Sequence, residues 1–588
     1  MAIVKAVPRE LFIEAKRDVP ADGEIRLCMI SGHVIIIKLR SIDDAFLVQS
    51  NFSSGCLRLL VGDESELDRF DLNSVFANLV QMEIHSRTGS IGMRASIVGL
   101  PPVFITQWSE GYAITTPLMP PRELGLFLGG LDLEGSADVI RWGYPIDGRT
   151  LARNVSLVDA SASICIDEQG VLGIIGPVPF SISPEFSSYS LHKIIISLCE
   201  SFSHSAARMN CDRSVISLSG GIDSRAASVA LMKNNSPGRF VTLAANENSL
   251  EAKLARAFCE RYGAEHSVVQ LGKGFVDGIA DRLIKTARMT YGVSILSQSI
   301  DVYLYEQIGS GIVRRITGNL GNQIGRGGVE ALSTSDPERS IWSDDLGALL
   351  DRRACVPWFI ERMNHNGFAR VLFQQEISYS STPNFVVGSH FAVQQSPYAC
   401  RRQIELASAM FARSKNLRWV SRRYLKFRDL RHRICGTPIS RSFQRQYLTW
   451  ADELAADVPL NWGWKARGGW AKEWIGDSLL TAVDAASESG GSLGKIMTAI
   501  RRPTTMKWRD RPFHLVNWPR LIRYELKDFV HDVLGSQVVR HSGAFDIAKL
   551  NKILSMHYTG ERNFHSSIVR ALEIGSACLA LSDANRHC

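Results

Sequence analysis

The residues with the clearest chemical pattern lie between positions 214 and 231. A β-branched apolar run, 214–218, ends at the glycine pair of 219–221, and a helix-favouring segment, 225–231, follows directly. This order predicts a strand, a tight glycine turn and a helix whose N-terminal N–H groups can bind an anion. Two serines add hydroxyl groups, and the carboxylate of Asp223 suits a hard divalent cation. The pattern therefore indicates a site for the phosphates of a nucleotide.

The chain as a whole has the composition of a globular protein. Its 588 residues, 45% hydrophobic and 21% charged, predict two to four domains, and its net charge of +8 does not require a nucleic-acid partner. Eleven scattered cysteines without a C-x-x-C pair favour reduced, mostly buried thiols. There is neither the apolar core of a signal peptide nor an apolar run of about eighteen residues. We therefore expect a cytoplasmic protein with no transmembrane segment and no nucleic-acid partner.

The segment Ser219-Gly220-Gly221-Ile222-Asp223-Ser224 resembles the SGGxDS pyrophosphate loop of the ATP-pyrophosphatase (PP-loop) superfamily. Its surroundings resemble the asparagine-synthetase branch. A Walker-type G-x-x-x-x-G-K-[ST] motif does not occur, since the nearest segment, 490–495, is one residue short. The plainer alternative is a glycine turn in an ordinary α/β domain.

The first 185 residues are predicted to form a strand-rich domain. Short apolar runs separated by turns predict strands at 24–30, 33–38, 45–49, 56–61, 103–106, 111–116, 163–166 and 171–175. The resemblance implies an α+β, Ntn-hydrolase-like glutaminase domain here. That chemistry needs a cysteine as the first residue after Met1, and Ala2 stands there instead, so we expect an inactive glutaminase-like domain. Cys28, inside a predicted strand, is expected to pack in the core, and the substrate is expected to supply the amine.

Residues 186–588 are predicted to form the ATP-binding synthetase domain, with the boundary in the turn-rich piece 176–184. A helix is expected over 189–209, and strands at 239–244 and 267–271 flank a helix at 251–261. This alternation predicts an α/β, doubly wound parallel sheet that binds its ligand beyond the carboxyl ends of the strands. The last third is expected to be helical. Its tryptophans are expected to be core residues, with a peptide-binding groove as the alternative: Trp450, Trp462, Trp464, Trp470 and Trp474.

A second glycine-rich segment, 318–328, follows another predicted strand, 311–317. It lies where the family carries SGxGxDE, and Asn322-Gln323 replaces the acidic pair. The resemblance implies that Asn322 shares Mg²⁺ with Asp223 as a neutral oxygen ligand. Asn319 lies where the similar β-lactam synthetases carry a catalytic tyrosine. The alternative is a glycine-rich surface loop.

Further on, 393–400 resembles the family motif E-x-R-x-P-F-x-D, with Val393 in place of the glutamate. Lys426 lies twelve residues before Pro438, a spacing that fits the family's lysine, and Arg423 could take the same role. Such a cation would stabilise negative charge on the α-phosphate. The alternative is a solvated basic face of a helix.

The resemblance thus implies a complete set of site residues. The catalytic residues would be Lys426, Arg423 and Asn319, and the metal ligands Asp223 and Asn322. The ATP and pyrophosphate site would comprise Leu218, Ser219, Gly220, Gly221, Asp223, Ser224, Leu243, Thr317 and Gly318.

Among relatives, the absent N-terminal cysteine, Arg225 after the loop and the long divergent C-terminal half resemble lasso peptide cyclases. These enzymes use ATP and Mg²⁺ to activate an Asp or Glu side chain of a precursor peptide, and join it to the peptide's α-amine as a macrolactam. The resemblance implies a leader-peptide-processing protease as partner. The alternatives are a small-molecule amide synthetase of the asparagine or β-lactam type, a tRNA-modifying PP-loop enzyme, and a pseudoenzyme scaffold.

Overall fold

The computed structural model describes most of the chain outside its N-terminal 78 residues and two long segments of its second half. The described residues are 2–5, 24–28, 34–38, 56–62, 79–85, 90–100, 102–108, 111–115, 129–167, 171–177, 183–209, 211, 213–234, 238–290, 296–309, 311–326, 339–352, 371–413, 443–457, 518, 521–562 and 564–585.

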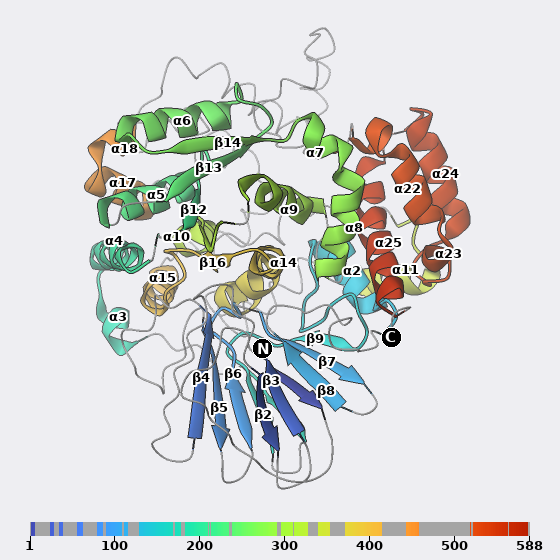
Figure 1. The fold of residues 1–588 in the computed structure, drawn as a ribbon, viewed down its shortest axis with the longest axis horizontal. Helices are drawn as coiled ribbons and strands as arrows, with labels where there is room; N and C mark the ends of the chain where they lie inside the picture. The colour runs from blue at the N-terminus through green and yellow to red at the C-terminus, as the bar shows by residue number, and fades with distance from the viewer. Residues whose placement is uncertain are drawn as a thin grey trace.

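The N-terminal part contains two antiparallel sheets, drawn at the bottom of Figure 1. The first has the order β2-β3-β1-β8-β7-β9: β2 (Glu24–Cys28), β3 (Val34–Lys38), β1 (Ala2–Lys5), β8 (Gly111–Thr115), β7 (Phe104–Trp108) and β9 (Val155–Leu157). The second has the order β11-β10-β6-β5-β4: β11 (Leu172–Ile175), β10 (Ser163–Ile166), β6 (Ile91–Arg94), β5 (Leu79–His85) and β4 (Cys56–Gly62). Along β6, Ile91 and Met93 are buried while Gly92 and Arg94 are half-buried, as expected of a strand with one face on a core.

The predicted strand-rich region is thereby confirmed at the level of secondary structure. Seven of the eight predicted strands match observed ones, and the predicted strand at 45–49 lies outside the described residues. β1, β5, β6 and β9 were not predicted. The strand of Cys28 is present, but its side chain lies outside the described part. Among the described cysteines, Cys165 on β10 is exposed because it lies on the outward face of its strand, whereas Cys199, Cys211, Cys259 and Cys578 are buried, as expected of mostly buried thiols.

The second sheet-forming region is a five-stranded parallel sheet with the order β14-β13-β12-β15-β16. Its strands are β14 (His266–Gln270), β13 (Arg239–Ala244), β12 (Ser214–Ser217), β15 (Arg314–Ile316) and β16 (Val393–Gln395). In chain order the sheet grows outward from β12 through β13 to β14, and then restarts on the other side of β12 with β15. The predicted parallel sheet is confirmed, and the reversal between β12 and β15 is where such sheets bind ligands.

Helices pack on this sheet in two groups. α5 (Ile222–Asn234) contacts α4 (Leu191–Ala207) and α17 (Phe443–Ala451), and α6 (Leu250–Tyr262) contacts β13 and β14. α9 (Leu296–Ile308) instead contacts α8 (Ile279–Thr290) and α14 (Ile377–Ser389). The predicted helix at 189–209 is confirmed as α4, whose apolar face, including Ile194, Leu198 and Phe202, is buried.

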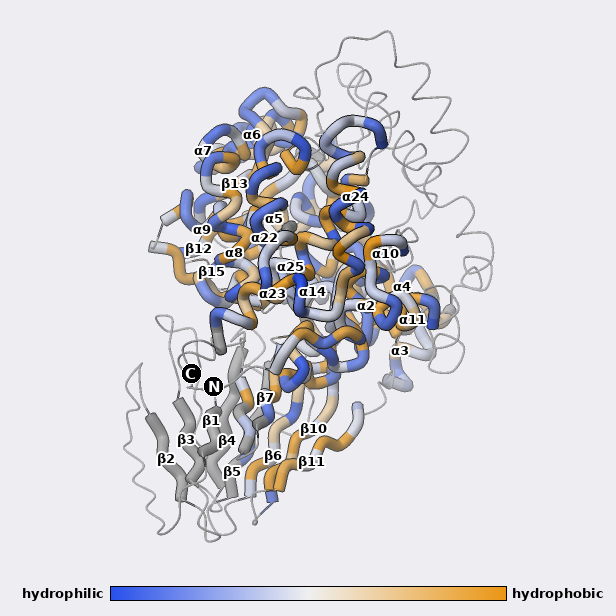
Figure 2. The backbone as a smooth tube through the Cα atoms, turned by 90° about the vertical axis from the view of Figure 1, so that its right-hand side faces the viewer, coloured by the Kyte–Doolittle hydropathy of each residue, from blue (hydrophilic) through white to orange (hydrophobic). Residues whose placement is uncertain are grey.

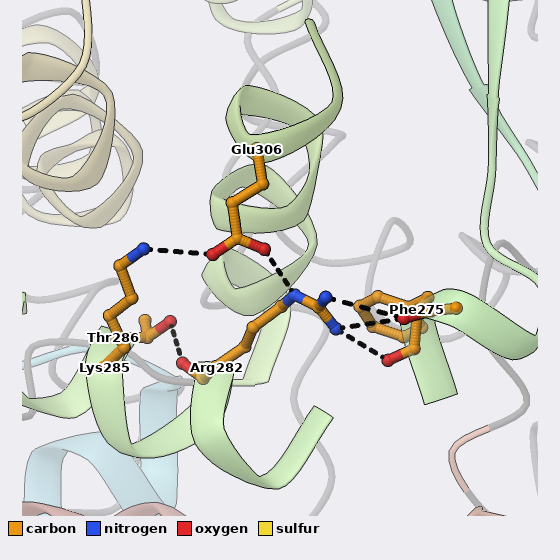
Figure 3. A network of polar contacts seen from close by, with 6 residues as sticks. Phe275, Arg282, Lys285, Thr286 and Glu306 are labelled. Carbon is orange, nitrogen blue, oxygen red and sulfur yellow. Dashed lines mark hydrogen bonds and ion pairs between the residues drawn. The ribbon is translucent and has the colours of Figure 1, made fainter. Parts of the chain in front are cut away.

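A polar cluster fixes the helices between β14 and β15 (Figure 3). The Arg282 guanidinium donates to Glu306 Oε2 at 2.7 Å and to the carbonyl oxygen of Phe275 at 2.9 Å, and Lys285 donates to Glu306 Oε1 at 3.0 Å. Burial alone would raise the pKa of Glu306, but the hydrogen bonds from Arg282 and Lys285 lower it. The cluster joins α7 (Lys273–Asp277), α8 and α9.

The C-terminal helices form a bundle at the right of Figure 1: α22 (Lys527–Gly535), α23 (Gln537–Arg540), α24 (Ile547–Tyr558) and α25 (His565–Asn585). α25 packs against α8 and α22. Hydrophobic and hydrophilic residues alternate along the described helices in Figure 2. None of the described helices is both long and apolar enough to cross a membrane.

The tryptophan prediction is wrong for Trp450, which is 65% exposed. On α17 the buried residues are Phe443, Gln444, Tyr447, Leu448 and Ala451, and Trp450 lies off that face, in an edge-to-face contact with the Tyr447 ring. Helical periodicity therefore turns it outward. The other four tryptophans lie outside the described residues.

Buried polar contacts join the strand-rich part to the helices before β16. Tyr144 donates to Glu376 Oε2 at 2.6 Å, and Glu376, at the end of η3 (Val371–Glu376), is fully buried. Tyr379 on α14 donates to Asp159 Oδ1 at 2.6 Å and accepts from the Gly148 N–H at 3.3 Å. The predicted boundary between two domains at residue 185 stays a prediction.

Candidate functional site

The loop between β12 and α5 is held by its own side chains. The Ser219 N–H donates to Ser224 Oγ at 3.1 Å, the Gly221 N–H donates to Ser219 Oγ at 3.2 Å, and the two serine hydroxyls are 2.8 Å apart. The strand, glycine turn and helix are confirmed as predicted. Because hydroxyl oxygens accept from the loop amides, an anion that binds here would replace weak neutral acceptors with charged ones.

A carboxylate accepts from the loop amide that lies between those of Ser219 and Gly221. The Gly220 N–H donates to Glu251 Oε2, which comes from the first turn of α6. Arg225, the residue after the loop motif, is fully buried. Burial lowers the pKa of Arg225 to about 10, and the nearby Glu251 acts in the opposite direction by favouring the cation. Glu251 therefore links the loop to a buried positive charge.

The second glycine-rich segment lies directly against the first. A Cβ at Gly318 would lie 2.5 Å from the Ser224 nitrogen and 2.7 Å from the Asp223 carbonyl carbon. A Cβ at Gly321 would lie 2.7 Å from Asp223 Cβ and 3.0 Å from its Oδ1. Only glycine permits so close an approach. The structure thus brings together the two segments that were predicted separately, at the carboxyl ends of neighbouring strands.

The turn between these glycines has an unusual backbone. Leu320 is buried and has a φ of 70°, a left-handed conformation that costs a leucine free energy. The Asn319 N–H donates to Thr317 Oγ1 at 3.2 Å, and the Asn319 carbonyl accepts from Ser396 Oγ at 2.6 Å. Asn319 itself is exposed, and Asn322 is half-buried in the first turn of α10 (Gly321–Arg326). The predicted residues of this segment therefore surround the end of β15.

Asp223 is the residue on which the site converges. Its carbonyl oxygen accepts from the Tyr398 hydroxyl at 3.0 Å, and its Oδ1 accepts from Gln444 Nε2 at 3.1 Å. Gln444 Nε2 also donates to the Gly321 carbonyl oxygen. Both Tyr398 and Gln444 are fully buried. Asp223 is therefore held from two sides by residues about 175 and 221 positions further along the chain.

Leu218 and Leu243, the predicted adenine neighbours, lie at the ends of adjacent strands. The Leu218 N–H donates to the Val241 carbonyl at 2.9 Å, and the Leu218 carbonyl accepts from Thr242 Oγ1 at 2.9 Å. Thr242 Oγ1 is also 2.9 Å from His266 Nε2, and burial lowers the pKa of His266. The backbone of Leu218 is thus already paired. Any contact to a base here would rest on the two leucine side chains.

Part of the predicted site is not described. Lys426 and Arg423 lie outside the described residues, so their role stays a prediction. The residues that the sequence did not single out as site residues are Glu251, Ser396, Tyr398 and Gln444. Within the described ranges, no three His, Cys, Asp or Glu side chains gather as a metal site. Gln444 Nε2 donates both to the Asp223 carboxylate and to the Gly321 carbonyl oxygen.

No protein-family model matches this chain, and no curated protein sequence matches it either.

Proposed function

We propose that this protein is an ATP-dependent, AMP-forming carbon–nitrogen ligase of the asparagine-synthetase type. The observation that carries the proposal is the backbone contact of Gly318 and Gly321 with Asp223 and Ser224, at the point where the strand order of the parallel sheet reverses. Two glycine-rich turns packed at such a point would offer backbone N–H groups to a chain of phosphates.

The chemistry follows from binding a triphosphate with its β- and γ-phosphates on the loop at 219–224. A substrate carboxylate oxygen attacks the α-phosphorus, the bond from that phosphorus to the bridging oxygen breaks, and pyrophosphate leaves. An amine nitrogen then attacks the acyl carbon of the adenylate. The C–O bond to AMP breaks, and the nitrogen loses a proton. In this scheme the loop acts by positioning and charge stabilisation.

The described residues divide these tasks. Loop amides now paired with Ser219, Ser224 and Glu251 would turn to phosphate oxygens. Asn319 cannot accept the proton of the amine, because a carboxamide does not titrate near neutral pH. It could orient a carbonyl or an amine by hydrogen bonding.

The residues around Asp223 fit Mg²⁺, which prefers oxygen ligands and is commonly bound by one or two carboxylates together with substrate phosphates. A cation held there would neutralise charge on the phosphates. Asp223 is half-buried at a helix N-terminus, and the Gly321 carbonyl oxygen accepts from the same Gln444 Nε2 as its carboxylate. Asn322, half-buried one residue beyond Gly321, is the proposed second ligand.

For the substrate class we propose a peptide, closed to a macrolactam between an Asp or Glu side chain and its own α-amine. The support is the likeness to lasso peptide cyclases in the loop and in Arg225. A precursor peptide and a leader-peptide-processing protease would then be the partners. The Ntn-hydrolase-like character of the N-terminal part belongs to the same proposal.

The test is to incubate the protein with ATP, Mg²⁺ and synthetic peptides whose sequences are encoded beside its gene. We expect AMP and pyrophosphate, and a peptide product lighter by one water. Asp223→Ala should abolish AMP formation. Asp277→Ala is the matched control, because Asp277 is an exposed carboxylate that pairs with Lys273 on a helix surface.

Three results would contradict all or part of the proposal. AMP formed with free amino acids and ammonia, but not with peptides, would overturn the peptide substrate class and indicate a small-molecule amide synthetase. No ATP binding would indicate a scaffold without catalysis. Retention on tRNA with a steep dependence on salt would indicate an RNA-directed enzyme.

A further inference from the structure

Gln444 lies at the centre of the contacts around Asp223, yet it comes from α17, far along the chain. Its Nε2 is shared between Asp223 Oδ1, at 3.1 Å, and the Gly321 carbonyl oxygen. A Cβ at Gly325 would overlap its amide group, so the third glycine of this segment makes room for Gln444. The side chain is fully buried. Gln444 is therefore built into the site.

The other end of the same amide is not satisfied. Gln444 Oε1 is buried and has no hydrogen-bond partner within the described part of the chain. A buried amide oxygen without a partner destabilises the folded chain, so such atoms are rare unless a ligand uses them. From bond lengths, Oε1 lies about 2.2 Å from Nε2. It is thus within a few ångströms of the Asp223 carboxylate.

We propose that Gln444 is a cation ligand, and that its Oε1 joins Asp223 in holding the Mg²⁺ of the nucleotide. The inference rests on the proposed function and adds a residue to its site. A half-turn of the amide about the Cγ–Cδ bond exchanges Nε2 and Oε1 without changing the shape of the side chain. Oε1 then faces Asp223 Oδ1 and the Gly321 carbonyl oxygen, and Nε2 takes the position that Oε1 has now.

The donor chemistry agrees with this assignment. A carboxylate, an amide oxygen and a carbonyl oxygen are the hard ligands that Mg²⁺ selects. In the second glycine-rich segment, Asn322 and Gln323 stand where the family motif has two acidic residues, so these two positions offer no carboxylate. A neutral oxygen from α17 would supply part of the coordination that this segment lacks.

The experiment measures how much Mg²⁺ strengthens nucleotide binding, without any turnover. Isothermal titration gives the Kd of α,β-methylene-ATP with Mg²⁺ and, separately, with EDTA, and the ratio of the two is the cation enhancement. Gln444→Ala should lower this enhancement about tenfold, a larger loss than any change in its Kd in EDTA. Gln444→Glu should raise the enhancement and weaken binding in EDTA, because the added carboxylate binds the cation and repels the phosphates.

Gln403→Ala is the matched control. Gln403 is also fully buried with an Oε1 that has no partner among the described residues, but its Nε2 donates to the Pro397 carbonyl instead of to a carboxylate. Its enhancement should equal that of the unmodified protein. Circular dichroism verifies that each variant folds. If Gln444→Ala does not fold, the cation enhancement of Gln444→Glu tests the assignment.

The outcomes separate this inference from the proposed function. If Asp223→Asn abolishes the enhancement while both Gln444 variants leave it unchanged, the assignment of Gln444 is wrong and the nucleotide site stands. If the unmodified protein does not bind the nucleotide analogue, both are overturned. A reduced enhancement in Gln444→Ala together with an unchanged one in Gln403→Ala supports the assignment.

Discussion

The contact between the two glycine-rich turns makes a sharp prediction for Gly318→Ala. The new Cβ would lie 2.5 Å from the Ser224 nitrogen and 2.7 Å from the Asp223 carbonyl carbon. Ordinary van der Waals contact begins at 3.4 Å, so the turns must separate by about 0.9 Å. Both neighbours are main-chain atoms, which cannot turn aside as a flexible side chain can.

The size of the effect follows from that displacement. Overpacking of a well-packed region costs roughly 1–3 kcal/mol, and we expect the upper part of this range because backbone must move. A misplacement of about 1 Å at a reacting centre can lower a rate about 100-fold. Gly318→Ala should therefore lose about 100-fold in kcat/KM for AMP formation, and its thermal unfolding midpoint should fall by a few degrees.

The control is Gly311→Ala, seven residues earlier, where an added Cβ would meet no atom within 4 Å. Both variants are compared by ATP binding, AMP formation and thermal unfolding. Gly311→Ala should behave as the unmodified protein. If Gly318→Ala also retains unmodified ATP affinity and kcat/KM, the two turns do not depend on close contact, and our reasoning about the site fails.

Two further predictions concern charge. Glu251→Gln should lower the unfolding midpoint, because the buried Arg225 cation loses a nearby negative charge. The same change should tighten pyrophosphate binding several-fold by removing a carboxylate from the Gly220 N–H. An unchanged or raised unfolding midpoint, or an unchanged or weakened pyrophosphate affinity, would contradict the role given to Glu251. Burial lowers the pKa of His557 to about 4, and its Nδ1 accepts from the Phe564 N–H at 3.2 Å, so it is neutral when folded. The unfolded chain takes up that proton first, so stability should fall as pH drops from about 6.5 to about 4, and chemical unfolding of His557→Asn should show a smaller loss over that interval.

The sequence predicted most strands wherever apolar β-branched residues dominate. β13 matches its predicted bounds, because 239–244 carries valine and threonine between turns. β16 was not predicted, since its three residues, Val393–Gln395, include two glutamines. It is a strand because β15 offers a parallel edge, which pairs Arg314 with Val393. Tertiary pairing outweighs local propensity in such short strands.

The candidate site was predicted where its residues are contiguous. The loop at 219–224 and the turn at 317–322 each carry their glycines and polar groups within a few positions, so spacing reveals them. Gln444 gave no such signal, because a lone glutamine on an amphipathic helix is ordinary. Glu251 was likewise read as part of a helix. Their roles depend on which strands lie side by side, and that follows only from the folded sheet.

The adjacency of β12 and β15 also has a consequence for the order in which the protein is made. About ninety residues separate Ser224 from Gly318, and Gln444 follows well over a hundred later. At roughly 5–20 residues per second, the first turn leaves the ribosome on the order of 5–20 s before its partner turn. During that interval its amides can pair only with nearby residues such as Ser219 and Ser224. ATP can therefore stabilise only chains that have been translated well past residue 318.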